Sequence, residues 1–486
     1  MKPNFLWGGS ISAAQCEGAW NVDGKSPVEI DYATVASNDS MRTISYVTET
    51  GVNGIAGNFG LGMPEYAKRI EVDGEYYSNR NGIDFYNNYK EDILLFAEMG
   101  FKSLNLSISW ARIYPCGIEK GINWEGVEFY RSVLLELKKY NIEPICTLFK
   151  YDMPVYFEEQ LGGWKNKKLI DEFLAFAKVC FEEYKDLVKY WITFNEINVD
   201  IILQGVILGI ENNISSAFVR VHHQLLASAK AVKMAHQINP EYKIGCMICS
   251  MITYPLTPNP KDILAVQKKM QDIFWYCGDV MVRGNYPTYS SRIWKENNVE
   301  LAISLDDEKV LREGKVDFYA FSYYSSSALT AQKSELSVTG NMSSGIENPY
   351  LEKSEWGWTM DPDGLKYALH EIYDRYQIPL LIVENGLGAR DTLNDDGTVH
   401  DDYRINYLRT HIQKVIEACG EGVDLIGYNS WGCIDLIAAS TGQISKRYGY
   451  IYVDIDDNGN GTYERYRKDS FYWYKKVIES NGKNLD

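Results

Sequence analysis

Short runs of apolar and β-branched residues alternate along the chain with longer stretches in which apolar positions recur every three to four residues. The runs are typical of buried parallel strands and the stretches of amphipathic helices. Predicted strands cover residues 5–8, 103–109, 143–149, 190–195, 243–249, 317–322, 379–383 and 425–430. Predicted helices cover residues 83–99, 124–140, 168–187, 215–237, 261–282, 362–376, 402–419 and 470–479. Eight strands alternating with eight helices predict an α/β fold, a (β/α)8 TIM barrel.

No repeat of fixed period and no Pro- or Gly-rich linker divides the 486 residues. We therefore expect a single (β/α)8 domain over residues 1–486 with long βα loop insertions. The stretch of about 31–80 is rich in Gly, Asn and Tyr and weakly periodic. It is predicted to be an insertion after the first strand that forms a wall of the active-site mouth.

The formal net charge of −17 argues against nucleic acid or an anionic membrane as a partner. An anionic substrate would need a local cationic pocket. No run reaches 18 uninterrupted apolar residues, so no transmembrane helix is expected. The first residues carry no signal-peptide pattern, and the nine cysteines lie mostly in apolar runs. These features predict a cytoplasmic protein and leave its oligomeric state open, a homo-oligomer included.

Neither a metal nor a cofactor is predicted. Cys246 and Cys249 have the spacing of a redox or zinc motif, but they lie in an apolar strand and no second cysteine pair accompanies them. We interpret them as core residues.

Polar and aromatic residues follow most of the predicted strands. In a TIM barrel the working residues lie at the carboxyl ends of the strands, so these side chains are expected to face one another. In chain order they are Gln15, Arg112, Lys150, Asn195, Glu196, Tyr324, Glu384 and Trp431.

Glu196 and Glu384 follow the fourth and seventh strands, a placement that suits attack at a sugar's anomeric carbon with an acid on one face. At about 5.5 Å and an effective dielectric of about 20, two carboxylates repel by roughly 3 kcal/mol, or about two pK units. One of them therefore stays protonated near neutrality. We expect Arg112 and the phenol of Tyr324 to favour the ionised form of Glu384, which leaves Glu196 as the proton carrier.

Three motifs resemble those of the glycoside hydrolase family 1 β-glycosidases. Phe-Leu-Trp-Gly-Gly-Ser-Ile-Ser-Ala-Ala-Gln-Cys-Glu-Gly-Ala, beginning at Phe5, is similar to the family's amino-terminal signature. Thr-Phe-Asn-Glu-Ile from Thr193 resembles the acid/base motif, and Ile-Val-Glu-Asn-Gly from Ile382 the nucleophile motif. The resemblance implies a retaining β-glycosidase with Glu384 as nucleophile and Glu196 as general acid/base.

The same resemblance implies roles for further residues. Gln15 would bind glycon hydroxyls, Asn195 the 2-hydroxyl and Trp431 the sugar face. Trp358 would be the aglycone platform, with a core aromatic as the alternative interpretation. Lys150 and Tyr151 complete the predicted substrate-binding residues around the sugar.

The segment after the eighth strand indicates a phosphorylated substrate. Unphosphorylated-substrate members of the family carry a carboxylate there in an Asp-Asn-Phe-Glu-Trp run, and Ala438 stands in its place. A carboxylate would repel a 6-phosphate, whereas a hydroxyl, an ammonium and a phenol offer donors. The spacing of Ser440, Lys446 and Tyr448 resembles the phosphate clamp of the 6-phospho-β-glucosidases.

Other readings of the sequence stay open. Thr441 directly after the clamp serine favours the gluco configuration over a 6-phospho-β-galactosidase, which usually has Trp there. A β-glucosidase for unphosphorylated sugars and a catalytically inert sugar-phosphate-binding protein are the alternatives. The expected substrate is a phosphorylated β-glucoside disaccharide or aryl glucoside, cleaved to glucose 6-phosphate.

Lys150 departs from the family pattern because it replaces a histidine in the third-strand motif. A lysine can still donate to the sugar's 3-hydroxyl, but its full charge could depress the pKa values of the two carboxylates.

We expect Lys150→His to retain or raise turnover, because it restores the residue type that the resemblance implies. Steady-state hydrolysis by the variant and the wild type measures this. A large loss would show that the lysine has a role of its own.

Overall fold

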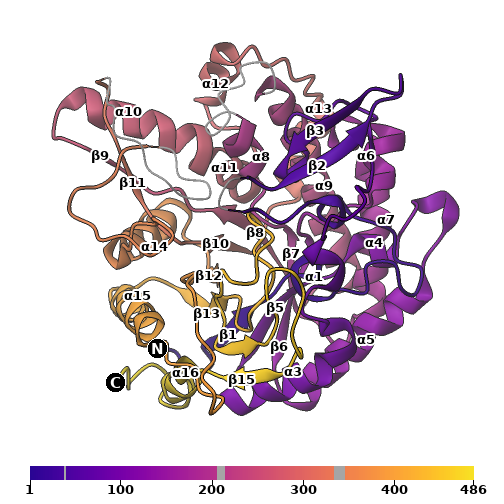
Figure 1. The fold of residues 1–486 in the computed structure, drawn as a ribbon. Helices are drawn as coiled ribbons and strands as arrows, with labels where there is room; N and C mark the ends of the chain where they lie inside the picture. Colours follow the sequence, from indigo (N-terminus) through magenta and orange to yellow (C-terminus); the bar gives the residue numbers. More distant parts are fainter. Residues whose placement is uncertain (38–39, 205–213, 333–344) are drawn as a thin grey trace.

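The central feature of the computed structural model, which describes residues 1–37, 40–204, 214–332 and 345–486, is a closed barrel of parallel strands (Figure 1). The strand order around the barrel is β1-β13-β12-β10-β8-β7-β6-β5. Every predicted strand forms one barrel strand, with its ends shifted by a few residues, so the predicted TIM barrel is confirmed. The bounds are β1 (Leu6–Ser10), β5 (Ser103–Ser107), β6 (Glu143–Phe149), β7 (Tyr190–Phe194), β8 (Lys243–Cys249), β10 (Phe318–Ser322), β12 (Leu380–Glu384) and β13 (Leu425–Trp431).

Strand β1 closes the barrel by pairing with the last strand and with the second barrel strand. Gly8 lies opposite Asn429 of β13 on one side and opposite Ser103 of β5 on the other. A Cβ atom at Gly8 would lie 1.9 Å from the Ser103 carbonyl oxygen. Glycine is therefore required at the seam, because the two backbones approach closely there.

The helices cover the outside of the barrel (Figure 1). In α5, the buried Val127, Tyr130, Leu134 and Leu137 recur at helical spacing and form the face toward the core. Helix α3 ends at Met99 because Gly100 adopts a left-handed conformation with φ of 87°. The large helices are α3 (Phe85–Met99), α5 (Trp124–Lys139), α7 (Leu169–Glu183), α9 (Ile214–Ile238), α14 (Pro362–Tyr376), α15 (Asp402–Gly420) and α16 (Asp469–Glu479).

The predicted single helix over residues 261–282 is wrong in one respect. The structure has α10 (Pro260–Met270), a π-helical turn η6 (Gln271–Trp275) and α11 (Tyr276–Arg283) in its place. The π-turn buries Ile273, Phe274 and Trp275. The sequence does not reveal this turn, because the apolar periodicity continues through it.

The predicted insertion of about 31–80 contains a small antiparallel sheet of β2 (Thr43–Val47), β3 (Asn53–Gly57) and β4 (Lys68–Arg69). Its positions 38–39 lie outside the described residues. The strands were not predicted, because their glycines and exposed apolar residues break the period-two pattern.

We find no helix, within the parts of the chain that the structure describes, whose length and apolar content would let it cross a membrane.

A buried ionic network lies behind the segment that follows β13. Lys468 pairs with both Asp391 and Asp435, and its side chain has no exposed surface. Arg404 pairs with Asp391 at 2.9 Å, and Arg447 pairs with Asp435 at 2.8 Å. The network therefore joins the chain after β12, helix α15, the segment after β13 and the start of α16.

Removing the central ammonium should destabilise the protein, because two buried carboxylates would lose their shared partner. We expect Lys468→Met to lower the free energy of unfolding by about 3–5 kcal/mol in urea denaturation. The matched control is Lys476→Met on the exposed face of α16, expected within about 0.5 kcal/mol of the wild type. Equal effects of the two substitutions would contradict a stabilising network.

Candidate active site

Two carboxylates lie at the carboxyl end of the barrel. Glu384 is the last residue of β12, and Glu196 follows the end of β7 by two positions. Both are buried, at 5% and 7% exposed. Their hydrogen-bond partners come from β6, β10 and the segments that follow these strands, so several parts of the rim meet here.

Both oxygens of Glu384 accept strong hydrogen bonds. The Lys150 ammonium donates to Oε1 at 2.7 Å, and the Tyr324 phenol donates to Oε2 at 2.7 Å. Burial and the negative charge of Glu384 raise the pKa of the Tyr324 phenol, so it remains a donor. Lys150 is only 3% exposed and also lies 4.2 Å from the centre of the Trp431 ring. This arrangement stabilises Glu384 as a carboxylate.

Glu196 has weaker, mostly neutral partners. The Ser322 hydroxyl donates to Oε1 at 2.6 Å, and the Tyr151 phenol donates to Oε2 at 3.2 Å. The backbone of Glu196 has a φ of 42°, a left-handed conformation that costs a non-glycine residue about 1–3 kcal/mol and is concentrated at functional sites. The conformation turns the side chain out of the strand direction at the rim.

The environments separate the protonation states of the two carboxyl groups. Burial and the negative charge of Glu384 raise the pKa of Glu196 to about 7, while Ser322 and Lys150 oppose the rise. A carboxylic acid near neutrality beside an ionised partner can donate a proton and later take one back. The predicted depressing effect of Lys150 is present but does not prevail.

Arg112 does not make the predicted contact with Glu384. Its guanidinium forms a buried ion pair with Glu17, with Nη2 3.0 Å from Oε2. The Tyr130 phenol donates to the other oxygen of Glu17 at 2.6 Å. The expectation that Arg112 favours the ionised form of Glu384 is therefore wrong for this structure, because Glu17 engages the guanidinium and Lys150 supplies the cation.

The other residues predicted to surround the sugar are buried at the same rim. Gln15 is 6% exposed and donates to the Ile437 carbonyl at 2.7 Å, so its amide supports the segment after β13. Asn195 is 5% exposed and directly precedes Glu196. Trp431 ends β13 and is 7% exposed.

A second group of residues adjoins Glu384 through aromatic contacts. The Trp358 ring lies 5.4 Å from the Tyr324 ring and 6.5 Å from the Tyr448 ring, measured between centres. The Lys446 ammonium lies 4.5 Å from the Trp358 ring centre and 5.0 Å from that of Trp356. Lys446 is 1% exposed, and burial lowers its pKa to about 8. Lys446, Tyr448 and Trp358 are thus brought together, and Trp358 connects them to Tyr324, which bonds to Glu384.

Two buried polar atoms near this group lack a hydrogen-bond partner among the described residues. They are the Ser440 hydroxyl and the indole nitrogen of Trp356. Buried donors without partners are rare in native proteins and commonly mark a site for water, an ion or a ligand. The Ser440 hydroxyl does not bond to Lys446 or Tyr448, so the predicted three-residue clamp is only partly assembled by direct contacts.

The sequence analysis did not assign roles to three residues that the structure places at the site. Ser322 bonds to Glu196, Trp356 flanks Lys446, and Glu17 engages Arg112. Glu17 lies within the amino-terminal motif quoted above, but no spacing rule shows which side chain of a motif points inward.

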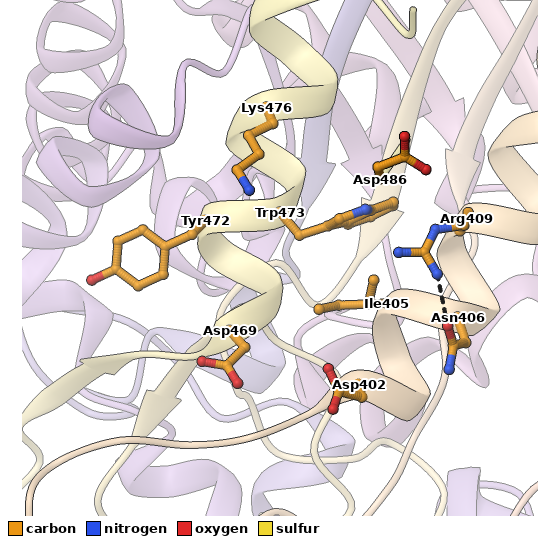
Figure 2. Close-up of a pocket in the computed structure, with 9 residues that line it drawn as sticks. All are labelled: Asp402, Ile405, Asn406, Arg409, Asp469, Tyr472, Trp473, Lys476 and Asp486. Atoms are coloured by element: carbon orange, nitrogen blue, oxygen red, sulfur yellow. Dashed lines mark hydrogen bonds between the residues drawn. The ribbon is translucent and has the colours of Figure 1, made fainter. Parts of the chain in front are cut away.

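A surface hollow lies elsewhere on the molecule, between α15, α16 and the C-terminal residue. It is lined by Asp402, Ile405, Asn406, Arg409, Asp469, Tyr472, Trp473, Lys476 and Asp486 (Figure 2). None of these residues belongs to a barrel strand. Its charges are mixed and it contains no carboxyl pair of the kind described above, so we do not assign the chemistry to it.

Comparison with known proteins agrees with this arrangement. The model of glycosyl hydrolase family 1 matches residues 1–54 and 63–483. The chain is 46% identical to the aryl-phospho-beta-D-glucosidase BglH of Bacillus subtilis, over 99% of this chain and 98% of the relative. It is 44% identical to the 6-phospho-beta-glucosidase AscB of Escherichia coli, over 99% of each chain. Among solved structures, a family 1 β-glucosidase from Thermotoga maritima superposes with a TM-score of 0.81 at 29% identity, over 100% of this chain and 99% of that one.

The pH dependence of glycoside hydrolysis should report Glu196 and its neighbours. Because its pKa is raised to about 7, the protonated form required for leaving-group departure is lost as pH rises through that value, and kcat/KM falls. Lys150→Met removes a cation that lowers this pKa, so the alkaline limb should move to higher pH. Lys150→Arg keeps the charge and should leave the limb near its wild-type position. A limb that does not move in Lys150→Met would show that Glu196 is not the group titrating.

Proposed function

Because this chain belongs to glycosyl hydrolase family 1, it is a glycoside hydrolase, and we propose that it hydrolyses 6-phospho-β-glucosides with retention of configuration. The products are glucose 6-phosphate and an alcohol, phenol or glucose. Relatives at 44–46% identity support this substrate class, because they include an aryl-phospho-β-glucosidase, a 6-phospho-β-glucosidase and a phospho-cellobiase.

The observation that carries the proposal is the buried Lys446 ammonium, which lies against Trp358. The Trp358 ring in turn contacts Tyr324, a hydrogen-bond partner of Glu384. Lys446 is nearly unexposed between two indole rings, although the whole chain carries a formal charge of −17. A substrate phosphate would accept a charge-assisted hydrogen bond from this ammonium and further hydrogen bonds from Ser440, Trp356 and Tyr448. Ala438 adds no competing negative charge.

We assign the first step to the two carboxyl groups. Glu384 attacks the anomeric carbon while protonated Glu196 donates its proton to the leaving oxygen, giving a covalent glycosyl-enzyme. Each oxygen of Glu384 is hydrogen-bonded, but each retains a lone pair for attack. Tyr324 and Lys150 hold the carboxylate in place and keep it ionised.

In the second step Glu196, now ionised, takes a proton from water. The water oxygen attacks the anomeric carbon, and the bond between this carbon and Glu384 breaks, which releases the sugar. Lys150 then stabilises the Glu384 carboxylate as it leaves. Gln15, Asn195 and Trp431 are proposed to bind the glycon, and Tyr151 orients Glu196 through its phenol. Arg112 supports the rim from behind through Glu17.

The role of Trp358 as a platform for the aglycone stays a prediction. Its contact with Lys446 would equally suit a position beside the phosphate. We further propose that the enzyme acts in the cytoplasm on sugars phosphorylated during import, since a phosphorylated sugar is retained there. Residues 1–486 are proposed to act as one catalytic domain.

The proposal is tested with p-nitrophenyl β-glucoside and its 6-phosphate, at matched concentrations. We expect the wild type to prefer the phosphorylated substrate strongly. Lys446→Ala should lower kcat/KM for the phosphorylated substrate by about 100-fold or more, the scale of a lost buried charge-assisted hydrogen bond. Its effect on the unphosphorylated substrate should be small.

One control variant and three possible outcomes separate the alternatives. Lys476→Ala changes an exposed lysine and should leave both rates unchanged. Preference for the unphosphorylated glucoside would refute the phosphate assignment, and preference for a 6-phospho-β-galactoside would refute the gluco assignment. Hydrolysis of none of these would favour a non-catalytic sugar-phosphate binder.

A further inference from the structure

The turn at residues 438–442, which leads from β13 toward Lys446, is held from one side by the N-terminal insertion. The Ala439 carbonyl accepts hydrogen bonds from Arg42 Nη1 and Asn58 Nδ2, both at 2.9 Å. The Gly442 carbonyl accepts one from the Ser78 hydroxyl at 2.7 Å. Residues nearly 400 positions apart in sequence thus fix the carbonyl side of this turn.

Arg42 is an unusual member of this contact. Its side chain is buried, with the residue 1% exposed. Its guanidinium donates to the carbonyls of Thr34, Ala439 and Ala33 and to the Asn79 side chain. All four acceptors are neutral.

The other buried arginines differ from Arg42 in this respect. Arg112 pairs with Glu17, Arg404 with Asp391, and Arg447 with Asp435. Within the described parts of the chain, Arg42 is the buried arginine for which no ion pair with a carboxylate is found. Burial lowers its pKa to about 9, as expected for a cation that is poorly compensated.

The positive charge lies directly behind Ser440. A Cβ atom at Gly442 would lie 3.2 Å from Arg42 Nε, so the guanidinium packs against the turn itself. The Ala439 carbonyl and the Ser440 N–H belong to one peptide group, in which they point in opposite directions. A cation bonded to that carbonyl polarises the peptide and makes the N–H on the opposite side a stronger donor.

The other side of this peptide is at Ser440, whose hydroxyl oxygen is buried. Neither its hydroxyl nor its N–H bonds to a described residue. On one side of the peptide, the Ala439 carbonyl thus accepts a hydrogen bond from the Arg42 cation. On the other side, the N–H and the hydroxyl of Ser440 have no partner among the described residues.

We propose that Arg42 is a positioning residue for the 6-phosphate, which fixes the turn and transmits its charge through the Ala439–Ser440 peptide to the bound dianion. The inference rests on the proposed function and extends the phosphate site to the N-terminal insertion. The substrate's phosphate would supply the negative charge that the buried guanidinium lacks. It also gives the insertion a role in selecting phosphorylated over unphosphorylated glucosides.

The test compares kcat/KM for p-nitrophenyl 6-phospho-β-glucoside and for the unphosphorylated glucoside in Arg42 variants. Arg42→Gln should lower the value for the phosphorylated substrate by about 10- to 100-fold, the range of a lost hydrogen bond to a charged group. The value for the unphosphorylated substrate should change by less than about threefold. Arg42→Lys keeps the charge and should recover part of the preference.

Two matched controls separate charge from structure. Asn58→Ala removes a neutral donor to the same carbonyl and should reduce the preference less than Arg42→Gln. Arg69→Gln removes an arginine of the same insertion that is paired with Glu29, and should leave the preference unchanged.

The outcomes are distinguishable. Equal losses on both substrates in Arg42→Gln would show a purely structural role and overturn the inference. If Arg42→Gln does not fold, Arg42→Lys decides. A loss of preference in Arg42→Lys, which keeps the charge, no smaller than the loss in Asn58→Ala, which removes a neutral donor, would overturn the inference, since hydrogen bonding and packing would matter and not charge. If every variant keeps the full preference for the phosphorylated glucoside, the inference about Arg42 is overturned and the proposed function stands. If the wild type itself shows no such preference, the proposed function is overturned.

Discussion

Closure of the barrel by β1 is the constraint on which the site depends. The pairing of β1 with β13 and β5 turns an open sheet into a ring, so all eight strand ends face one another at a single rim. Glu196 and Glu384 are separated by 188 positions in the chain, and each receives its partners from other strands. Without closure, neither carboxyl group would have the neighbours that set its protonation state.

Positive charges are buried near the rim, although the net charge of the whole chain is negative. The chain is strongly acidic, yet two lysines are buried in this region: Lys150 bonds to Glu384, and Lys446 lies against Trp358. Lys150 holds Glu384 ionised, whereas Glu196 has mainly neutral donors and a pKa raised to about 7 by burial and by Glu384. Burial, the charge of Glu384 and an ammonium bonded to only one of the two carboxyl groups thus give two residues of identical type different environments.

The surroundings of the site connect distant parts of the chain. The ionic network around Lys468 fixes Arg447, and Arg447 is flanked by Lys446 and Tyr448, whose side chains reach the aromatic group next to Tyr324. On the other side, the insertion holds the turn that carries Ser440. The segment proposed to bind phosphate therefore lies between a buried charged network and the N-terminal insertion, so its geometry depends on both.

The sequence by itself determined the eight strands, the barrel and the identity of the two glutamates, because apolar periodicity and contiguous motifs are local properties that a chain displays before it folds. It also indicated that Lys150 and Ala438 depart from the family pattern. Only the tertiary structure decided that Lys150 contacts Glu384, that Arg112 contacts Glu17, and that Arg42 lies behind Ser440. These pairings join residues from different strands and loops, and charge alone cannot choose among several carboxylates for one cation. Distance and burial, which exist only in the folded chain, make that choice.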